Sequence, residues 1–204
     1  KVILYLREHI PYIRSLYQEV IKVQGAYLSE AEFILKHVEG WHMNFASTLK
    51  YWSAVFGEEN MIVDRYLGKE YGDHGLFDDF LGKIGLQWND EFRIPSRGKS
   101  NVGISREWVE SKRIFNMLEN AGAPLQVLVD SMSNPERLSE ESIEYINNKI
   151  ASDVELINRD FNIRSPLGVS RLSAADIDCS NLNYDWIYTQ SVLLLLGRLL
   201  RSSR

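Results

Sequence analysis

The chain opens with an unbroken apolar run that leads directly into a helical pattern. Residues 2–6, Val-Ile-Leu-Tyr-Leu, show no polar alternation, which predicts a buried strand. From Pro11 to Val23 apolar residues recur at three- and four-residue spacing, which predicts a helix that ends at Gly25. A strand followed at once by a helix is the beginning of a βαβ unit, so the opening pattern favours an α/β fold.

Helix and strand signals continue to alternate up to residue 86. Ser29 and Glu32 form a capping box for a short helix that runs toward Gly40. Residues 61–63, with Tyr66, predict a second strand. Two more helices are predicted from apolar stripes, which are Phe45, Leu49, Trp52 and Phe56 before Gly57, and Leu76, Phe77, Phe80, Leu81 and Ile84 before Gly85. We therefore expect two strands of one sheet, joined by a long right-handed helical crossover.

The second half of the chain is mostly helical in its pattern. Residues 87–104 are a polar loop, after which Ser105 is a predicted N-cap for a helix broken at Gly122 and Pro124. Ser139 caps a long helix whose stripe is Ile143, Ile146, Ile150, Val154, Ile157 and Phe161. Residues 164–183 are a predicted loop, and a leucine-rich helix follows over residues 185–200. The predicted fold is α/β with a helix-rich C-terminal portion.

Composition narrows the class of protein. The chain has 204 residues, of which 45% are apolar and 25% charged, which suits a single domain with a real core. The net charge is −5 and no basic stripe is present, so a small anionic ligand is a better expectation than a nucleic acid. The longest apolar stretches, residues 2–6 and 192–196, have five residues each and are too short for a membrane span.

The cysteine content and the start of the chain suggest the cellular compartment of the protein and its place in a longer domain. Cys179 is the only cysteine, so neither an internal disulfide nor a cysteine-based zinc site is expected. No signal peptide opens the sequence, and together these features favour the cytoplasm. Lys1 stands directly before a strand pattern, from which we expect the chain to be the C-terminal part of a longer domain.

Arg7 and Ser15 are the strongest candidate binding residues. Arg7 follows the first predicted strand, at the carboxyl end where open α/β sheets bind ligands, and Ser15 lies eight positions later on the predicted helix. A helix N-terminus favours an anion, an arginine can hold one with two parallel N–H groups, and a serine hydroxyl can donate a further bond. A surface arginine and a helical serine bonded to its own backbone are the structural alternative.

This spacing resembles the 3′-phosphate-binding segment of sulfotransferases, in which an arginine at a strand end and a helical serine bind 3′-phosphoadenosine 5′-phosphosulfate. Residues 51–63 and 79–86 also resemble bacterial sulfotransferase-like proteins, in the order Tyr-Trp, Phe-Gly-Glu-Glu-Asn-Met-Ile-Val, Asp-Phe-Leu and Ile-Gly-Leu. The resemblance covers about the first 120 residues. It implies a P-loop-type parallel sheet and transfer of a sulfuryl group to a hydroxyl or amine, with a polysaccharide sugar among the acceptors.

A second candidate element is the loop Ser96-Arg97-Gly98-Lys99-Ser100-Asn101, whose two cations, glycine and hydroxyls suit an anion clamp. The resemblance assigns Arg97 and Lys99 to the same 3′-phosphate, although the family order is Arg-Lys-Gly and this chain has Arg-Gly-Lys. No G-x-x-x-x-G-K-[ST] loop is present, and in the family both that phosphosulfate loop and the catalytic base lie upstream. We therefore assign no catalytic residue.

Two other functions stay open from the sequence. Asp176 and Asp178 form a D-x-D, the metal-binding motif of many sugar-nucleotide glycosyltransferases, but no strand pattern precedes it. A non-catalytic helical interaction module is the other alternative, and the leucine-rich C-terminal helix would suit either the core or a homodimer face. The four histidines, His9, His37, His42 and His74, show no metal-ligand spacing and are expected in loops or at the surface, with His9 close enough to Arg7 to assist a phosphate.

Overall fold

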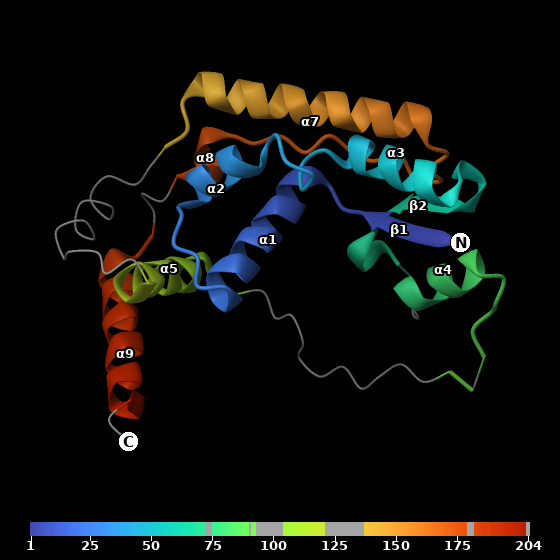
Figure 1. Cartoon of the computed structure of the whole chain (residues 1–204). Helices are drawn as coiled ribbons and strands as arrows, with labels where there is room; N and C mark the ends of the chain where they lie inside the picture. The colour runs from blue at the N-terminus through green and yellow to red at the C-terminus, as the bar shows by residue number, and fades with distance from the viewer. Residues whose placement is uncertain (72–74, 90, 93–103, 121–136, 179–181, 203–204) are drawn as a thin grey trace.

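The computed structural model describes residues 1–71, 75–89, 91–92, 104–120, 137–178 and 182–202. Figure 1 shows an elongated arrangement in which the long helix α7 lies along one side and the two strands lie toward one end. Helices α5 and α9 form the opposite end, and helix α1 runs between the strands and α5. Cys179, His74 and the loop with Arg97 and Lys99 lie outside the described residues.

The sheet is small and parallel. Strands β1 (Val2–Leu6) and β2 (Met61–Arg65) pair in parallel, with Val2 opposite Met61 and Leu6 opposite Arg65. The predicted pairing of two strands across a helical crossover is confirmed. Within the described residues no phosphate-binding loop accompanies the sheet, so the structure shows α/β character in a mostly helical chain.

Helices account for most of the described chain. Three α-helices precede β2: α1 (His9–Val23), α2 (Glu30–His37) and α3 (Phe45–Phe56). The helices after it are α4 (Leu76–Lys83), α5 (Arg106–Asn120), α7 (Glu140–Asp160), α8 (Ala174–Ile177) and α9 (Tyr184–Ser202), and short 3₁₀ turns cover Glu58–Asn60 and Gly68–Glu70. The N-caps predicted at Ser29 and Ser139 are confirmed, because each hydroxyl accepts an amide N–H of the following turn. The four residues of α8 lie in a segment predicted as loop.

The main core lies where α1, α2 and α7 meet. The stripes predicted for α1 and α7 are buried, as the spacing requires for helices that cover a common core. The buried residues of these two helices include Ile10, Ile13, Tyr17 and Ile21 of α1, and Ile146, Ile150, Val154 and Ile157 of α7. A smaller cluster joins α5 to α9 through Ile114 and Ile187.

The apolar stripes predicted for α3 and α4 are only partly buried. In α3 the buried residues are Ala46 and Leu49, whereas Trp52 is 36% and Phe56 50% exposed. In α4 only Leu81 is buried. The reason is that each helix is held by polar contacts: α3 receives a carboxylate from α7 at its first turn, and α4 contacts the strands through charged side chains.

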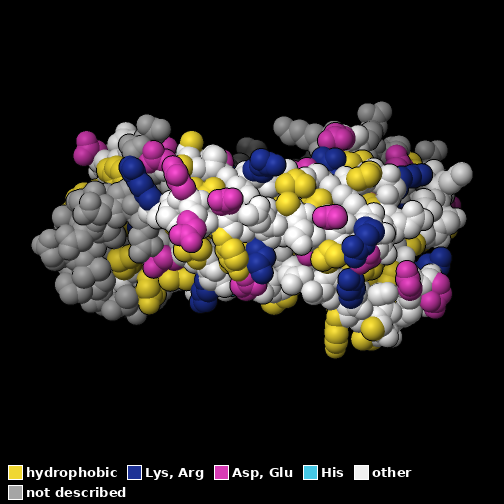
Figure 2. Space-filling view, turned by 90° about the horizontal axis from the view of Figure 1, so that it is seen from above, with side chains coloured by type: hydrophobic (Ala, Val, Ile, Leu, Met, Phe, Trp, Pro, Cys, Tyr) yellow, Lys and Arg dark blue, Asp and Glu magenta, His cyan; other side chains and the backbone are white. Residues whose placement is uncertain are grey.

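The charge on the surface and the lengths of the helices indicate which kinds of partner the protein could contact. On the face formed by α7, basic and acidic side chains alternate without either sign forming a continuous patch (Figure 2). Among the described residues no helix is both long and apolar enough to cross a membrane.

Strand β1 is only half-buried apart from Leu6, which differs from the fully buried strand that its apolar run predicts.

Candidate functional site

Arg7 and Ser15 lie in the positions expected of a ligand site at the first strand–helix junction. Arg7 directly follows β1 and is exposed, and Ser15 is exposed on α1, on the side away from the buried Ile13 and Tyr17. Within the described part of the chain neither side chain makes a hydrogen bond or ion pair, so the local backbone bond that was the alternative for Ser15 is not formed. Both polar groups are therefore available to an external ligand.

The helix start itself offers few free donors. The amide of Ile10 donates to the hydroxyl of Ser170 at 3.0 Å, and Pro11 has no N–H. The expectation that several N–H groups of this helix would be free for an anion is wrong for this reason. The helix has no acidic residue in its first turn, although its N-cap residue, Glu8, is acidic.

A second arginine at the same sheet edge is already paired. Arg65, the last residue of β2, lies beside Leu6 in the register, and its guanidinium is 3.3 Å from a carboxylate oxygen of Glu8. A second carboxylate, that of Glu70, lies 4.0 Å from it. Arg65 is therefore engaged by two carboxylates, whereas Arg7 makes no ion pair within the described residues.

His9 is buried and has a structural partner. Its Nε2 lies 2.8 Å from Oδ2 of Asp153 on α7, and its ring stacks on Phe45 with centroids 4.4 Å apart. The same Asp153 carboxylate accepts the amide N–H groups of Phe45 and Ala46, each at 3.0 Å. The loop or surface position expected for His9 is wrong, because the side chain is fully buried. Its ring is turned toward Asp153 of α7, which also contradicts the suggestion that it could assist a phosphate.

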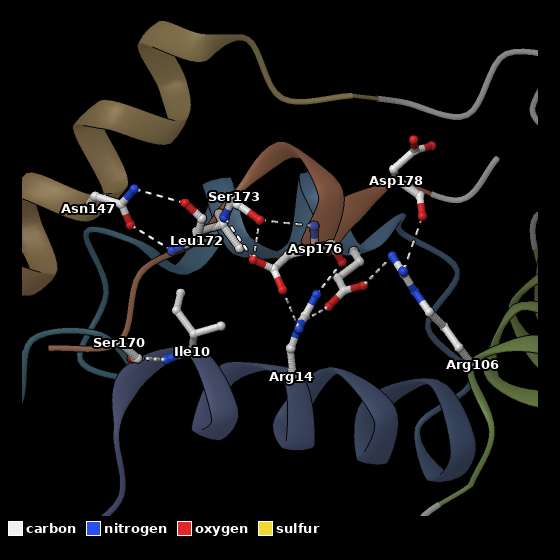
Figure 3. A network of polar contacts seen from close by, with 10 residues as sticks. Ile10, Arg14, Arg106, Asn147, Ser170, Leu172, Ser173, Asp176 and Asp178 are labelled. Carbon is white, nitrogen blue, oxygen red and sulfur yellow. Dashed lines mark hydrogen bonds and ion pairs between the residues drawn. The ribbon is translucent and has the colours of Figure 1, made fainter. Parts of the chain in front are cut away.

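A network of two arginines and two acidic residues joins four elements (Figure 3). On α1, Arg14 donates from Nε to Glu30 Oε1 at 2.8 Å, and its guanidinium also contacts the carboxylate and the carbonyl of Asp176. Arg106, which begins α5, lies 3.2 Å from the second oxygen of Glu30 and donates to the carbonyl of Asp178. Opposite charges are matched within this network, so it holds α1, α2, α5 and α8 together and leaves no spare charge for a ligand.

The D-x-D carboxylates take part in this framework. Asp176 forms a capping box with Ser173, accepting the hydroxyl of Ser173 at 2.6 Å. These bonds, together with Arg14, hold the pKa of Asp176 below its ordinary value. Asp178 lies 3.8 Å from Arg137. Within the described residues no group of His, Cys, Asp and Glu side chains is arranged to hold a metal ion.

A third polar cluster, which the sequence pattern does not reveal, lies beside the sheet. Lys83 of α4 is 3.0 Å from Asp64 on β2 and also contacts Asp79, which accepts the hydroxyl of Tyr5 at 2.6 Å. The cluster borders a depression of about 350 Å³ that also includes Arg164. Spacing on α4 could have suggested only the Asp79–Lys83 pair, because Tyr5 and Asp64 are brought in by the strands.

The side chains of this cluster keep their ordinary protonation states and are poorly suited to catalysis. Burial alone would lower the pKa of Lys83, but its hydrogen bonds to Asp79 and Asp64 outweigh burial and raise that pKa. Burial and the bond to Asp79 likewise raise the pKa of Tyr5. A lysine held protonated and a phenol held neutral serve poorly as nucleophile or base near neutral pH, so the cluster anchors α4 to the strands.

No protein-family model, curated protein or solved structure matches this chain. The candidate site therefore depends on its own geometry and chemistry. The sequence assigns four binding residues. Arg7, which follows β1, and Ser15, on α1, both have exposed side chains. Arg97 and Lys99 lie outside the described residues.

Proposed function

We propose that this protein is sulfotransferase-like and binds 3′-phosphoadenosine 5′-phosphosulfate through Arg7 and Ser15, with Arg97 and Lys99 assisting. The observation that supports the proposal is an exposed arginine at the carboxyl end of a parallel strand, without an ion pair among the described residues, followed by an exposed serine on the next helix. The guanidinium supplies charge and paired N–H donors for a phosphate, and the hydroxyl supplies a further donor.

The reaction would be transfer of the sulfuryl group to a hydroxyl or amine, with a carbohydrate among the acceptors. Such a transfer depends on in-line positioning and on neutralising the oxygens of the moving group, as phosphoryl transfer does. The residues proposed here bind the donor nucleotide at its 3′-phosphate. They leave the chemical step to other groups, and no metal is needed at this phosphate.

A ligand comparison tests the proposal on the full-length protein. Adenosine 3′,5′-bisphosphate should raise the melting temperature, since saturation at a hundred times Kd contributes about 2.7 kcal/mol of stability. Adenosine 5′-monophosphate is the matched control, because it lacks only the phosphate that Arg7 and Ser15 would hold. Equal shifts with both nucleotides, or no shift with either, would contradict the assignment.

The same assay separates the alternatives. A manganese-dependent shift with a sugar nucleotide, without a response to the bisphosphate, would favour a glycosyltransferase. The contacts of Asp176 with Ser173 and Arg14 do not support that function, because they use the carboxylate within the fold. No response to any nucleotide would favour a non-catalytic interaction module.

A further inference from the structure

A cluster of exposed aromatic side chains surrounds a depression at the start of α3. The depression measures about 450 Å³ and is lined by Glu39, Trp41, Asn44, Ser47, Thr48, Tyr51 and Trp52. Trp41 is 67% exposed, Tyr51 70% and Trp52 36%. Its volume lies within the roughly 300–1,000 Å³ typical of ligand pockets. Large aromatic rings gathered in one exposed hollow indicate a binding surface.

The rings are held in place by their neighbours. Trp41 packs against His42 with ring centroids 3.7 Å apart and an interplanar angle of 31°. His42 is in turn contacted by the hydroxyl of Tyr12 on α1, at 3.3 Å from Nδ1. Trp52 contacts the ring of Phe56, with centroids 6.1 Å apart, and α3 carries Tyr51 next to it. Because one face of the Trp41 indole packs on His42 while most of its surface is exposed, its other face can stack on a flat ligand.

Polar groups suited to a neutral ligand border the rings. The hydroxyls of Ser47 and Tyr51 and the indole N–H groups of Trp41 and Trp52 have no hydrogen-bond partner within the described part of the chain. The side-chain oxygen of Asn44 already accepts the amide of Ser47 at 3.1 Å. Donors and hydroxyls therefore lie around apolar faces, as in pockets that orient a ligand with a few polar contacts.

The charge of the depression decides the class of ligand. Among the described residues that line it, Glu39 alone is ionic, and Glu39 forms an ion pair with Lys149 of α7 at 3.0 Å. Burial, together with the nearby His37, lowers the pKa of His42, which disfavours the charged form of this imidazole. A cationic ligand would meet a carboxylate that is already paired, and an anionic ligand would meet no cation among the described lining residues. The surface is complementary to a neutral ligand that combines an apolar face with hydroxyl groups.

We propose that the depression bordered by Trp41, Tyr51 and Trp52 binds a pyranose ring of a neutral oligosaccharide. The C–H groups on one face of such a ring carry slight positive charge and stack on the electron-rich face of an aromatic side chain. The hydroxyl groups at the ring edge then meet the hydroxyls and N–H groups that border the depression. This inference does not depend on nucleotide binding at Arg7.

Saturation-transfer NMR tests the proposal with maltohexaose, cellohexaose and laminarihexaose, without nucleotide present. At least one hexasaccharide should receive saturation on its ring protons. Trp41→Ala and Tyr51→Ala should each weaken binding about tenfold, the scale of one lost aromatic stacking contact. Both residues are so exposed that the variants should fold, which matching circular dichroism spectra would establish.

The chain supplies matched controls on α9. Trp186 is 38% and Tyr188 54% exposed, and neither lines the depression, so Trp186→Ala and Tyr188→Ala should leave binding unchanged. Three outcomes overturn the proposal: none of the three hexasaccharides binds, Trp41→Ala and Tyr51→Ala bind as tightly as the wild type, or choline binds where the sugars do not. The last outcome would identify the rings as a site for a cation.

Discussion

The Nε2 atom of His9 lies 2.8 Å from Oδ2 of Asp153, and this contact joins the start of α1 to the middle of α7. The histidine is fully buried and the carboxylate nearly so. The two amide N–H groups that Asp153 also accepts begin α3, so one carboxylate joins three helices. The buried carboxylate is satisfied by three hydrogen-bond donors. Without the carboxylate, each of these donors would lack a hydrogen-bond acceptor.

Asp153→Ala should therefore destabilise the protein strongly. Asp153→Ala leaves the His9 ring and the amides of Phe45 and Ala46 without their acceptor. Each buried donor left unsatisfied costs about 1–3 kcal/mol, so the total loss should be at least about 3 kcal/mol. Urea denaturation measures the loss as a decrease in the free energy of unfolding. Glu155→Ala is the control, since Glu155 is exposed on the same helix and its loss should cost less than about 0.5 kcal/mol. A small effect of Asp153→Ala would show that the contact does not stabilise the fold.

Asn116 should be similarly sensitive. From α5 its amide nitrogen donates to the carbonyls of Ile21 and Ala26, at 2.8 and 2.7 Å, where α1 ends. Asn116→Ala should lower the free energy of unfolding by about 2–3 kcal/mol, because two carbonyls lose their donor. Chemical denaturation provides the value, and Asn148→Ala at an exposed position of α7 should leave it almost unchanged. Equal midpoints and slopes for both variants would refute the role of Asn116.

The Asp79–Lys83 contact predicts a dependence of stability on pH. Burial would raise the pKa of Asp79, but hydrogen bonds from Lys83 and Tyr5 outweigh it and lower that pKa from its ordinary 3.8. A lowered acid pKa stabilises the fold above the ordinary value, and this stability is lost as the pH falls through the lowered pKa. Asp79→Asn should therefore destabilise at pH 7 by about 2 kcal/mol and much less near pH 2.

Urea unfolding at a series of pH values from neutral to acidic measures this difference. Asp185→Asn, at an exposed position of α9, is the matched control and should give nearly the wild-type curve. A constant difference between wild type and Asp79→Asn across the series would exclude the carboxylate charge as its source. The raised pKa of Lys83 adds stability that is present below its ordinary 10.5 and is lost only as the pH rises through the raised value.

Arg7→Ala should weaken binding of adenosine 3′,5′-bisphosphate by about 2 kcal/mol, close to thirtyfold in Kd. The reason is the loss of a charge-assisted contact to the 3′-phosphate. Because the side chain is exposed, the melting temperature without ligand should not change. Calorimetric titration provides the affinities, with Arg137→Ala as the control at another exposed arginine. Wild-type affinity in Arg7→Ala would disprove the assignment of this residue.

Local patterns in the sequence determined the helices and strands that depend on their own residues. The stripes of α1 and α7 are buried as spacing predicts, because a long amphipathic helix has one apolar side whichever partner covers it. The caps at Ser29 and Ser139 form within a single turn, so nothing distant is needed. The exposed positions of Arg7 and Ser15 likewise follow from a strand end and the open side of a helix.

Tertiary structure decided the contacts between distant parts of the chain. His9 and Asp153 are 144 positions apart, and Arg14 and Asp176 are 162 apart, so no spacing rule connects them. The exposure of Trp52 could not be predicted either. Its aromatic side chain is expected to be buried, but it is exposed and lines the same depression as Trp41. Whether an apolar or charged side chain is covered depends on which elements pack against it, and that is fixed only when the whole chain has folded.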